Sequence, residues 1–295
     1  MAKIVTIINF KGGVGKTICS VEIATSLAKY YGRRVLLVDL DPQASASLFV
    51  MQSQEQWKAH RDSNGTTFNL FNKEDAKTFS ISKAIVRDVV PGVMGFDLLP
   101  SSPELVDVDL RLVEFIGYNT LKRYFEQVQD DYDYIICDCP PNFNPVTKNS
   151  LWASDAYIVP TFPDYLSTYG IGLLQGSVNK FFTLANDTGH AVQVPVPVLG
   201  GIIVTRFKTN AKAPAQFYNQ LQHEYPGHVF KHIVHDSIVV ANAPDEHMPV
   251  SALPRPNGKA IEIQEQFKGL AGEFISRIHH LQKAKHTPVA RATKR

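Results

Sequence analysis

The sequence of 295 residues is poor in cysteine, with only Cys19, Cys137 and Cys139. So few thiols, odd in number, cannot form the disulfide framework of a small secreted domain. Cys137 and Cys139 flank Asp138 at the end of an apolar run, so their side chains should point to one face of a strand. We expect reduced, partly buried thiols, because free cysteine is often buried. A metal site would need a matching Cys or His pair nearby, and the sequence has none there.

The sequence also lacks a strong net charge and long hydrophobic runs. The formal net charge is +2, so a nucleic-acid or membrane partner would have to bind a local patch. No uninterrupted apolar stretch approaches the roughly 20 residues that span a bilayer, and no signal peptide with a cleavage site opens the chain. We therefore expect a cytoplasmic protein. Because internal repeats and linkers rich in proline or serine are absent, we predict one domain over residues 1–281 and a basic tail over 282–295.

Apolar strands alternate with helical patterns along the chain. Strands are predicted at residues 3–9, 33–41, 96–100, 134–138, 157–160 and 201–205. Helices are predicted at residues 17–30, 80–89, 103–124 with a break near Gly117, 168–184, 213–224 and 261–281. Gly32 should end the first helix, and residues 51–94 are less clear, apart from the helical pattern at 80–89. The first strand, turn, helix and second strand form a βαβ unit, which builds parallel sheets. This order predicts an α/β fold like that of P-loop NTPases, with a mostly parallel, twisted sheet and helices on both faces.

A candidate phosphate-binding loop follows the first strand. The run reads Lys11, Gly12, Gly13, Val14, Gly15, Lys16, Thr17 and Ile18. It fits the pattern G-x-x-x-x-G-K-[ST], except that Phe10 stands at the first glycine. Glycines let backbone N–H groups cradle phosphate oxygens, and the following helix adds its positive N-terminal end. We expect Lys16 to reach the β- and γ-phosphates of ATP and the Thr17 hydroxyl to ligate Mg²⁺.

Acidic residues end two of the predicted buried strands. Asp39 and Asp41 close the run VLLVDLD, and Asp138 closes YIICD. Ligands in open α/β sheets bind at the carboxyl ends of the strands, and a phosphate loop needs acids for the metal ion and the attacking water. We predict that all three acids face the nucleotide. The alternative for each is an acid that only starts a turn.

Together these motifs resemble the ParA/MinD family of ATPases, and most of all its ParA/Soj branch. KGGVGKT, with a second lysine at Lys11, resembles the deviant Walker A motif of that family. VLLVDLDPQAS resembles the segment that follows its second strand, and DYIICDCPP resembles its Walker B region. FDLLPSSPELVDVDLRL, VPTFPDYLSTYGIGLL and LGGIIVTRF resemble other core segments, so that the resemblance covers about residues 1–275.

The resemblance implies catalytic roles for individual residues. Lys11 would reach across a nucleotide-sandwich homodimer to the phosphates of the partner, so hydrolysis would depend on dimerisation. Asp41 would position the attacking water. Thr17, Asp39 and Asp138 would form the Mg²⁺ site, the two acids acting largely through water.

The resemblance also implies an adenine site and a cycle. The adenine would lie near Thr205, Arg206, His235 and Asp236, although these residues depart from those usual in the family. Hydrolysis would be slow. The ATP-bound dimer would bind a surface, and a ParB-like or adaptor protein would trigger hydrolysis and release.

The surface implied for the ParA branch is non-specific DNA, and for the MinD branch it is the membrane. Candidate DNA-binding residues are Arg206, Lys208, Lys212, Lys231 and Arg255. Asp236 and Val239 stand where arginines are common in the family, and Lys259 and the basic tail would compensate. The tail lacks the bulky apolar residues of an amphipathic anchor. We therefore predict a nucleoid-associated protein that drives partition or positioning of a cargo, and a MinD-like membrane ATPase is the alternative.

Two further readings come from other classes of protein. An electron-transfer ATPase resembling nitrogenase iron protein would need a cluster held by cysteines from both subunits, and Cys137 and Cys139 lie close to the Walker B acid. A small-molecule kinase would use the same phosphate loop but needs an acceptor site. The sequence names neither the cargo nor the activating partner.

Overall fold

A single sheet of six parallel strands forms the centre of the protein, in the order β3-β2-β4-β1-β5-β6. The computed structural model describes all residues except 73–77, 109–117, 188–193, 209–211, 280 and 282–295. The predicted basic tail therefore lies outside the described residues. The strands are β1 (Lys3–Ile7), β2 (Val35–Asp39), β3 (Phe96–Leu99), β4 (Tyr134–Asp138), β5 (Ala156–Thr161) and β6 (Val198–Val204). Every residue of β2 and of β4 is buried, as their uninterrupted apolar runs predict for strands covered on both faces.

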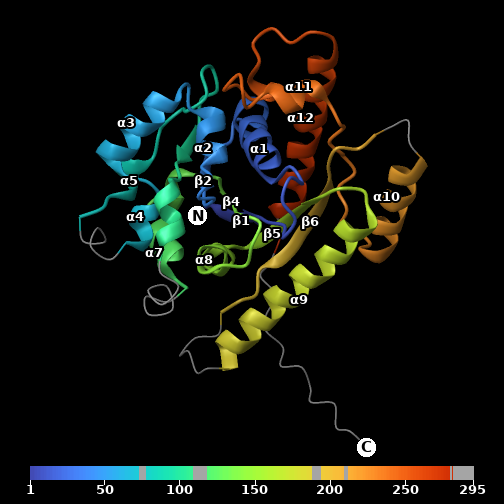
Figure 1. Ribbon diagram of the computed structural model, residues 1–295, viewed down its shortest axis with the longest axis horizontal. Coiled ribbons are helices and arrows are strands. Elements are labelled where there is room, and N and C mark those ends of the chain that lie inside the picture. Colours follow the sequence, from blue (N-terminus) through green and yellow to red (C-terminus); the bar gives the residue numbers. More distant parts are fainter. Residues whose placement is uncertain (73–77, 109–117, 188–193, 209–211, 280, 282–295) are drawn as a thin grey trace, which may run out of the picture.

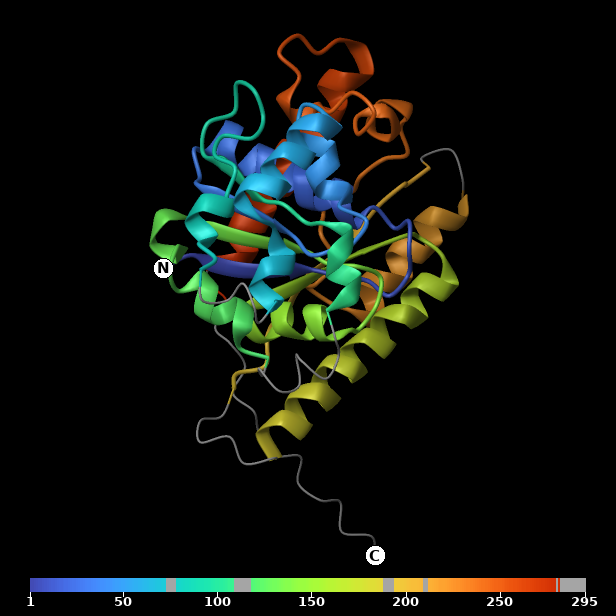
Figure 2. The same cartoon turned by 60° about the vertical axis from the view of Figure 1, so that its left-hand side comes forward.

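Helices cover both faces of the sheet, which confirms the predicted α/β architecture (Figures 1 and 2). On one face α1 (Lys16–Tyr31) and α12 (Gly258–Ile278) share a core with β1. On the other face α8 (Pro145–Ala153) and α9 (Tyr165–Asp187) pack on the opposite side chains of the same strands. The other α-helices within the described residues are α2 (Ser45–Val50), α3 (Gln54–Asn64), α4 (Thr67–Phe71), α5 (Ile81–Ala84), α7 (Thr120–Phe125), α10 (Lys212–Glu224) and α11 (Ile238–Asn242). The same part of the chain contains the short 3-10 helices η2 (Pro103–Asp107), η3 (Gln129–Asp131) and η4 (Val250–Ala252).

Helix α1 links the phosphate loop to the core. It packs on the sheet beside α12, and every residue from Cys19 to Ala28 is buried. Gly32 ends it with a φ of 59°, its N–H group donates to the carbonyl of Ala28, and the N–H of Arg33 donates to the carbonyl of Leu27. The predicted stop is therefore confirmed, because glycine adopts this left-handed conformation without a Cβ penalty.

Two predicted helices differ from the structure in the described residues. The first part of the helix predicted at 103–124 is a 3-10 helix, η2, that ends before the extended residue Val108, whereas α7 begins at Thr120, after the break predicted near Gly117. The helix predicted at 80–89 is helical only in α5, because β-branched Val86 instead forms an antiparallel bridge with Leu98. By contrast, the undecided stretch after residue 51 contains α3, whose Trp57 is buried while most of its other side chains are exposed or partly exposed.

Strand register brings the predicted acids together. Asp138 at the end of β4 pairs in register with Ile7 of β1 on one side and Asp39 of β2 on the other. Because the strands are parallel, the phosphate loop after β1 and both carboxylates lie at the same edge of the sheet. The carboxyl edge of β1, β2 and β4 is therefore the place to look for a ligand site.

Candidate functional site

The phosphate loop leaves β1 and turns into α1 through two left-handed glycines. Gly13 has a φ of 73° and Gly15 a φ of 80°, a region that other residues rarely adopt. Around Gly12 and Gly13 an added Cβ would meet nothing within 4 Å, so this side of the loop is open. Successive backbone groups in such conformations form a concave nest of N–H donors that suits an anion.

Buried polar side chains hold this loop in place. Asn9 is 2% exposed; its Oδ1 accepts from the backbone N–H of Lys11 at 2.9 Å, and its Nδ2 donates to the Pro160 carbonyl at 2.8 Å. The Thr205 hydroxyl donates to the Val14 carbonyl at 2.9 Å. Asn9 was missed in the sequence because a single asparagine between a strand and a loop carries no motif. Thr205, predicted beside the adenine, braces the loop from β6.

Lys16, Thr17 and Asp138 meet behind the loop. Thr17 Oγ1 donates to Asp138 Oδ2 at 2.8 Å, and Ser20 Oγ donates to Asp138 Oδ1 at 2.8 Å. Lys16 Nζ lies 3.4 Å from the carbonyl oxygen of Lys11 and so folds back over the loop. A hydroxyl beside a carboxylate is the oxygen donor set that Mg²⁺ prefers, with phosphate oxygens and water completing the octahedron. The predicted trio of Lys16, Thr17 and Asp138 is brought together.

Burial changes the electrostatics of this group. Burial raises the pKa of Asp138, while the hydroxyls of Ser20 and Thr17 and the charge of Lys16 oppose that rise. Burial lowers the pKa of Lys16, and the carboxylates of Asp138 and Asp41 counter this effect. A desolvated ammonium and carboxylate interact strongly with any charge that enters the site, because little water screens them.

Asp39 lies beside Asp138 but faces a different segment. It is fully buried, and its Oδ2 accepts from the backbone N–H of Ser47 at 2.8 Å and from the Ser47 hydroxyl at 2.7 Å. Its Oδ1 accepts from the backbone N–H of Asp41 at 3.1 Å. Burial, followed by the charge of Asp138, raises the pKa of Asp39. Asp39 therefore fixes the loop between residues 41 and 47, and like Asp138 it has a protein donor on each oxygen, which leaves room for a metal role only through water.

Asp41 stands at the mouth of the site. Its side chain is partly exposed, and its Oδ1 accepts from the backbone N–H of Gln43 at 2.9 Å. The carboxylate is close enough to Lys16 to raise the pKa of that lysine. A solvent-accessible carboxylate held by its own turn, next to the phosphate loop, is placed to orient a water molecule.

Lys11 is bound to α9 within the same chain. Its Nζ donates to Asp164 Oδ2 at 2.9 Å and to Ser167 Oγ at 3.1 Å, and it lies 5.2 Å from the centre of the Phe162 ring. Asp164 also accepts from the backbone N–H of Ser167 at 2.7 Å, in the manner of a helix cap. Sequence reasoning missed this contact. An acid at the start of a helical pattern is a recognisable cap signal, but the signal does not indicate which lysine the cap will bind.

A pocket of about 330 Å³ lies on the other side of the loop. Gly13, Gly15 and Ile18 form its phosphate-loop wall. The opposite wall holds all four residues that were predicted near the adenine, namely Thr205, Arg206, His235 and Asp236. Val240 and Ala241 of α11 supply apolar surface. The volume and the mixed lining suit a nucleoside.

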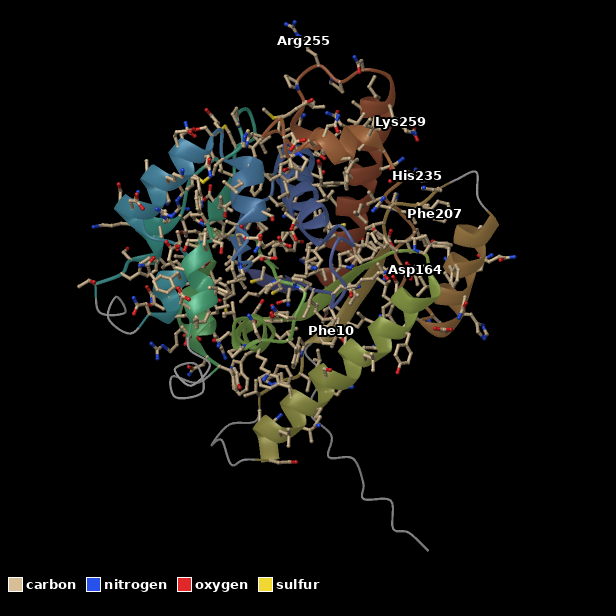
Figure 3. All side chains as sticks on the ribbon, in the orientation of Figure 1. Phe10, Asp164, Phe207, His235, Arg255 and Lys259 are labelled. Carbon is tan, nitrogen blue, oxygen red and sulfur yellow. The ribbon has the colours of Figure 1, made fainter. Side chains whose placement is uncertain are left out.

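The predicted DNA-binding residues lie on several segments of the chain. Arg206 and Lys208 lie beside Asp236, and the exposed Lys231 lies beside the C-terminal part of α12, where Glu273 accepts from its backbone N–H. Arg255 is exposed on the loop before α12, well separated from His235 in Figure 3. The backbone of Lys212 begins α10, and its side chain lies outside the described residues.

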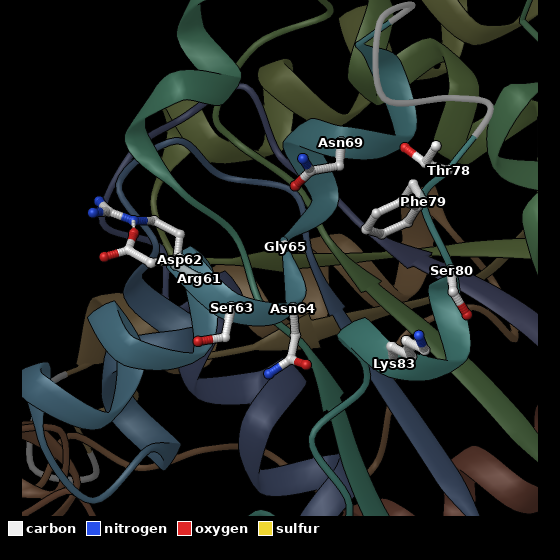
Figure 4. Close-up of a pocket in the computed structure, with 10 residues that line it drawn as sticks. All are labelled: Arg61, Asp62, Ser63, Asn64, Gly65, Asn69, Thr78, Phe79, Ser80 and Lys83. Carbon is white, nitrogen blue, oxygen red and sulfur yellow. Dashed lines mark hydrogen bonds and ion pairs between the residues drawn. The ribbon is translucent and has the colours of Figure 1, made fainter.

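A second hollow, of about 350 Å³, lies between α3, α4 and α5 (Figure 4). Its polar wall includes Arg61, which already pairs with Asp62 at 2.8 Å. No residue of the phosphate loop lines it. This hollow is therefore separate from the candidate nucleotide site at the phosphate loop.

The described residues contain no cluster of three or more His, Cys, Asp or Glu side chains that could hold a metal ion. The three cysteines are free, and all of them are fully buried rather than partly buried as predicted. Burial raises the pKa of the Cys137 thiol to about 12, so it stays protonated. Within the described part of the chain, no helix has both the length and the hydrophobicity that crossing a bilayer requires.

Comparison with known proteins gives consistent results. Residues 2–188 match the family described as AAA domain. The sporulation initiation inhibitor protein Soj of Bacillus subtilis is 30% identical over 264 residues, which cover 89% of this chain and 95% of Soj. The chromosome-partitioning ATPase Soj of Thermus thermophilus is 30% identical over 281 residues, or 93% of this chain and 96% of the relative.

A solved structure shares the fold. Cobyrinic acid a,c-diamide synthase from Mycobacterium smegmatis, with a bound ATP analogue and magnesium, superposes with a TM-score of 0.68 at 24% identity. The match covers 97% of this chain and all of that one.

Proposed function

The chain belongs to the ParA/MinD family of ATPases, and from that premise we propose that it is a ParA-type positioning ATPase. It binds ATP and Mg²⁺ at the phosphate loop, forms a homodimer with ATP and binds DNA without sequence preference. A ParB-like or adaptor protein stimulates its slow hydrolysis and so releases it. This cycle moves DNA or another cargo over the nucleoid.

The observation that carries the proposal is the group formed by the open glycine loop, the buried Lys16 and the pair Thr17–Asp138. Gly13 and Gly15 have φ values of 73° and 80°, and Thr17 Oγ1 lies 2.8 Å from Asp138 Oδ2. These residues fit ATP with Mg²⁺: the loop and Lys16 would hold the phosphates, and Thr17 and Asp138 would hold the ion. When bound, Mg²⁺ neutralises charge on the phosphate oxygens.

Hydrolysis needs a placed water and positive charge near the phosphates. Asp41 orients the water from the mouth of the site, and Asp39 keeps Asp41 in position through the hydrogen bond to its backbone. Lys16 supplies one positive charge. Its burial makes that charge effective, because the attraction between charges grows as water is excluded.

Lys11 supplies a second positive charge and connects hydrolysis to dimerisation. In the monomer it is held by Asp164 and Ser167 of its own chain. Its side chain remains 38% exposed, so it can turn outward when a partner approaches. In the dimer it reaches the phosphates bound by the partner, and hydrolysis is therefore slow for a lone protomer.

Exposed lysine and arginine side chains favour DNA over the membrane as the surface to which the dimer binds. Arg206, Lys208 and Lys231 carry exposed side chains, and Arg255 is exposed on the loop before α12. Each lysine or arginine that meets a phosphate releases a counterion, so dispersed cations give non-specific and salt-dependent binding. A dimer doubles the number of such contacts, which makes binding depend on ATP.

Binding to random duplex DNA tests the proposal. We expect wild-type protein to bind with ATP, more weakly with ADP, and with an affinity that falls steeply with salt. Lys16→Ala should not bind with ATP. If ATP-driven dimers form but bind no DNA at any salt concentration, the DNA surface is wrong, and sedimentation with anionic liposomes then tests the membrane alternative.

A further inference from the structure

One acid lies between two of the cations assigned to DNA. Asp236 Oδ1 is 3.4 Å from Arg206 Nε, and Asp236 Oδ2 is 3.8 Å from Lys208 Nζ. Each oxygen of this carboxylate therefore faces a different cation. Both cationic side chains are more than half exposed, at 61% and 67%, so they are accessible apart from this contact.

The backbone holds these three residues together. The N–H of Asp236 donates to the carbonyl of Phe207 at 3.1 Å, and the N–H of Phe207 donates to the carbonyl of Val234 at 3.1 Å. The two segments thus run side by side, with Asp236 beside residues 206 and 208. Arg206 adopts a left-handed φ of 49°, which is costly for a residue with a side chain. The surrounding structure imposes this conformation on Arg206.

The same residues reach the nucleotide site. Asp236 and Arg206 both line the pocket whose other wall is formed by Gly13 and Gly15. The guanidinium of Arg206 lies 5.2 Å from the centre of the Phe162 ring, and Lys11 Nζ lies 5.2 Å from the centre of that same ring. A nucleoside in the pocket would therefore lie against Arg206 and against Asp236, the carboxylate that pairs with Arg206 and Lys208.

We propose that Asp236 is an internal counter-ion that masks Arg206 and Lys208 from DNA, and that the nucleoside part of ATP weakens this masking when it enters the pocket. The inference rests on the proposed DNA-binding function. It adds a second way in which nucleotide controls DNA affinity, besides dimerisation. A cation paired with Asp236 is already neutralised by that carboxylate, so it displaces few of the counterions condensed on DNA until the pair opens.

Asp236→Asn tests the masking in the absence of nucleotide. Exposed ion pairs are weak, at about 0.2–1 kcal/mol each, so two of them predict roughly two- to thirtyfold tighter binding to random duplex DNA for the variant. One or two newly available cations should steepen the slope of log K against log salt by about 0.9 to 1.8. Glu265→Gln is the matched control, because Glu265 pairs with Lys268 on α12 at 3.5 Å and its loss changes the net charge equally.

The following outcomes test the masking by Asp236 separately from the proposed DNA-binding function. Asp236→Asn should exceed Glu265→Gln in affinity and slope, and the gain should vanish in an Arg206→Ala/Lys208→Ala background. Equal effects of Asp236→Asn and Glu265→Gln would overturn the masking. ATP-dependent DNA binding by the wild type, read in the same titration, reports on the proposed function independently.

The link to the pocket has its own readout. At an ATP concentration that saturates each protein, determined separately, ATP should increase DNA affinity less for Asp236→Asn than for the wild type, by the same two- to thirtyfold factor. An equal increase in both proteins would show that the pocket does not control Asp236, and would overturn that part of the inference.

Discussion

The contact between Lys11 and Asp164 predicts that Asp164→Asn strengthens ATP-driven dimerisation. In the monomer the Lys11 ammonium donates to Asp164 at 2.9 Å, and this bond must open before Lys11 can reach a partner. Asparagine removes the charge but keeps an oxygen that can accept from the N–H of Ser167, as Asp164 does at 2.7 Å. The substitution therefore weakens the ion pair and preserves the start of α9.

The size of the effect follows from the exposure of the pair. The side chains are 38% and 42% exposed, so solvent screens the attraction and about 0.2–1 kcal/mol per pair is appropriate. A symmetric dimer opens two pairs. The dimer dissociation constant should thus fall by roughly two- to thirtyfold, since about 1.4 kcal/mol corresponds to a factor of ten. Asp164→Ala should dimerise similarly but lose about 1 kcal/mol of folding stability, because it also removes the cap.

Sedimentation equilibrium with saturating ATP measures this constant. Asp187→Asn, at the opposite end of α9, is the control for a change of net charge. If Asp164→Asn dimerises no better than the Asp187→Asn control, or more weakly than the wild type, the pair does not restrain Lys11 and the argument is refuted.

Three further predictions concern the loop and the core. Gly15→Ala should cost about 1–2 kcal/mol of stability, read by urea unfolding, because alanine is strained at a φ of 80°; an unchanged midpoint would contradict the assigned backbone. In calorimetry, Thr17→Ala should weaken ATP binding with Mg²⁺ at least about tenfold but should change ADP binding without Mg²⁺ little. Thr17→Ser keeps the hydroxyl beside Asp138, so this variant should bind both nucleotides like the wild type. Burial raises the pKa of Glu22, which accepts from backbone N–H groups at the start of η4 (Val250–Ala252), to about 7. Its protonated form is therefore favoured on folding, and stability is lost as pH rises from about 4.5 through about 7. Between pH 5 and 8 the wild type should lose about 2–3 kcal/mol more than Glu22→Gln, and equal losses would show that Glu22 does not titrate there.

The sequence predicted those parts of the site that are local in the chain. The phosphate loop follows a strand and opens a helix, so Lys16 and Thr17 could be placed from spacing alone. Asp138 could be placed because strands buried on both faces have continuous apolar patterns, and parallel strands end at one edge.

Other parts depend on contacts between distant segments. Lys11 and Asp164 are far apart in the chain, and nothing in either segment specifies that they pair. Asp39 has the same sequence context as Asp138, yet it binds the turn at Ser47, because the chain after β2 folds back over it. The misassigned helix at residues 80–89 has the same kind of cause, since its apolar spacing fits a helix but Val86 pairs with β3.

The most direct test of the central claim is the molar mass of the protein in solution by light scattering. We expect twice the monomer mass for the wild type with ATP and Mg²⁺, and the monomer mass for the wild type with ADP and for Lys16→Ala with ATP. One and the same mass in all three samples would contradict an ATPase that dimerises on ATP at this phosphate loop.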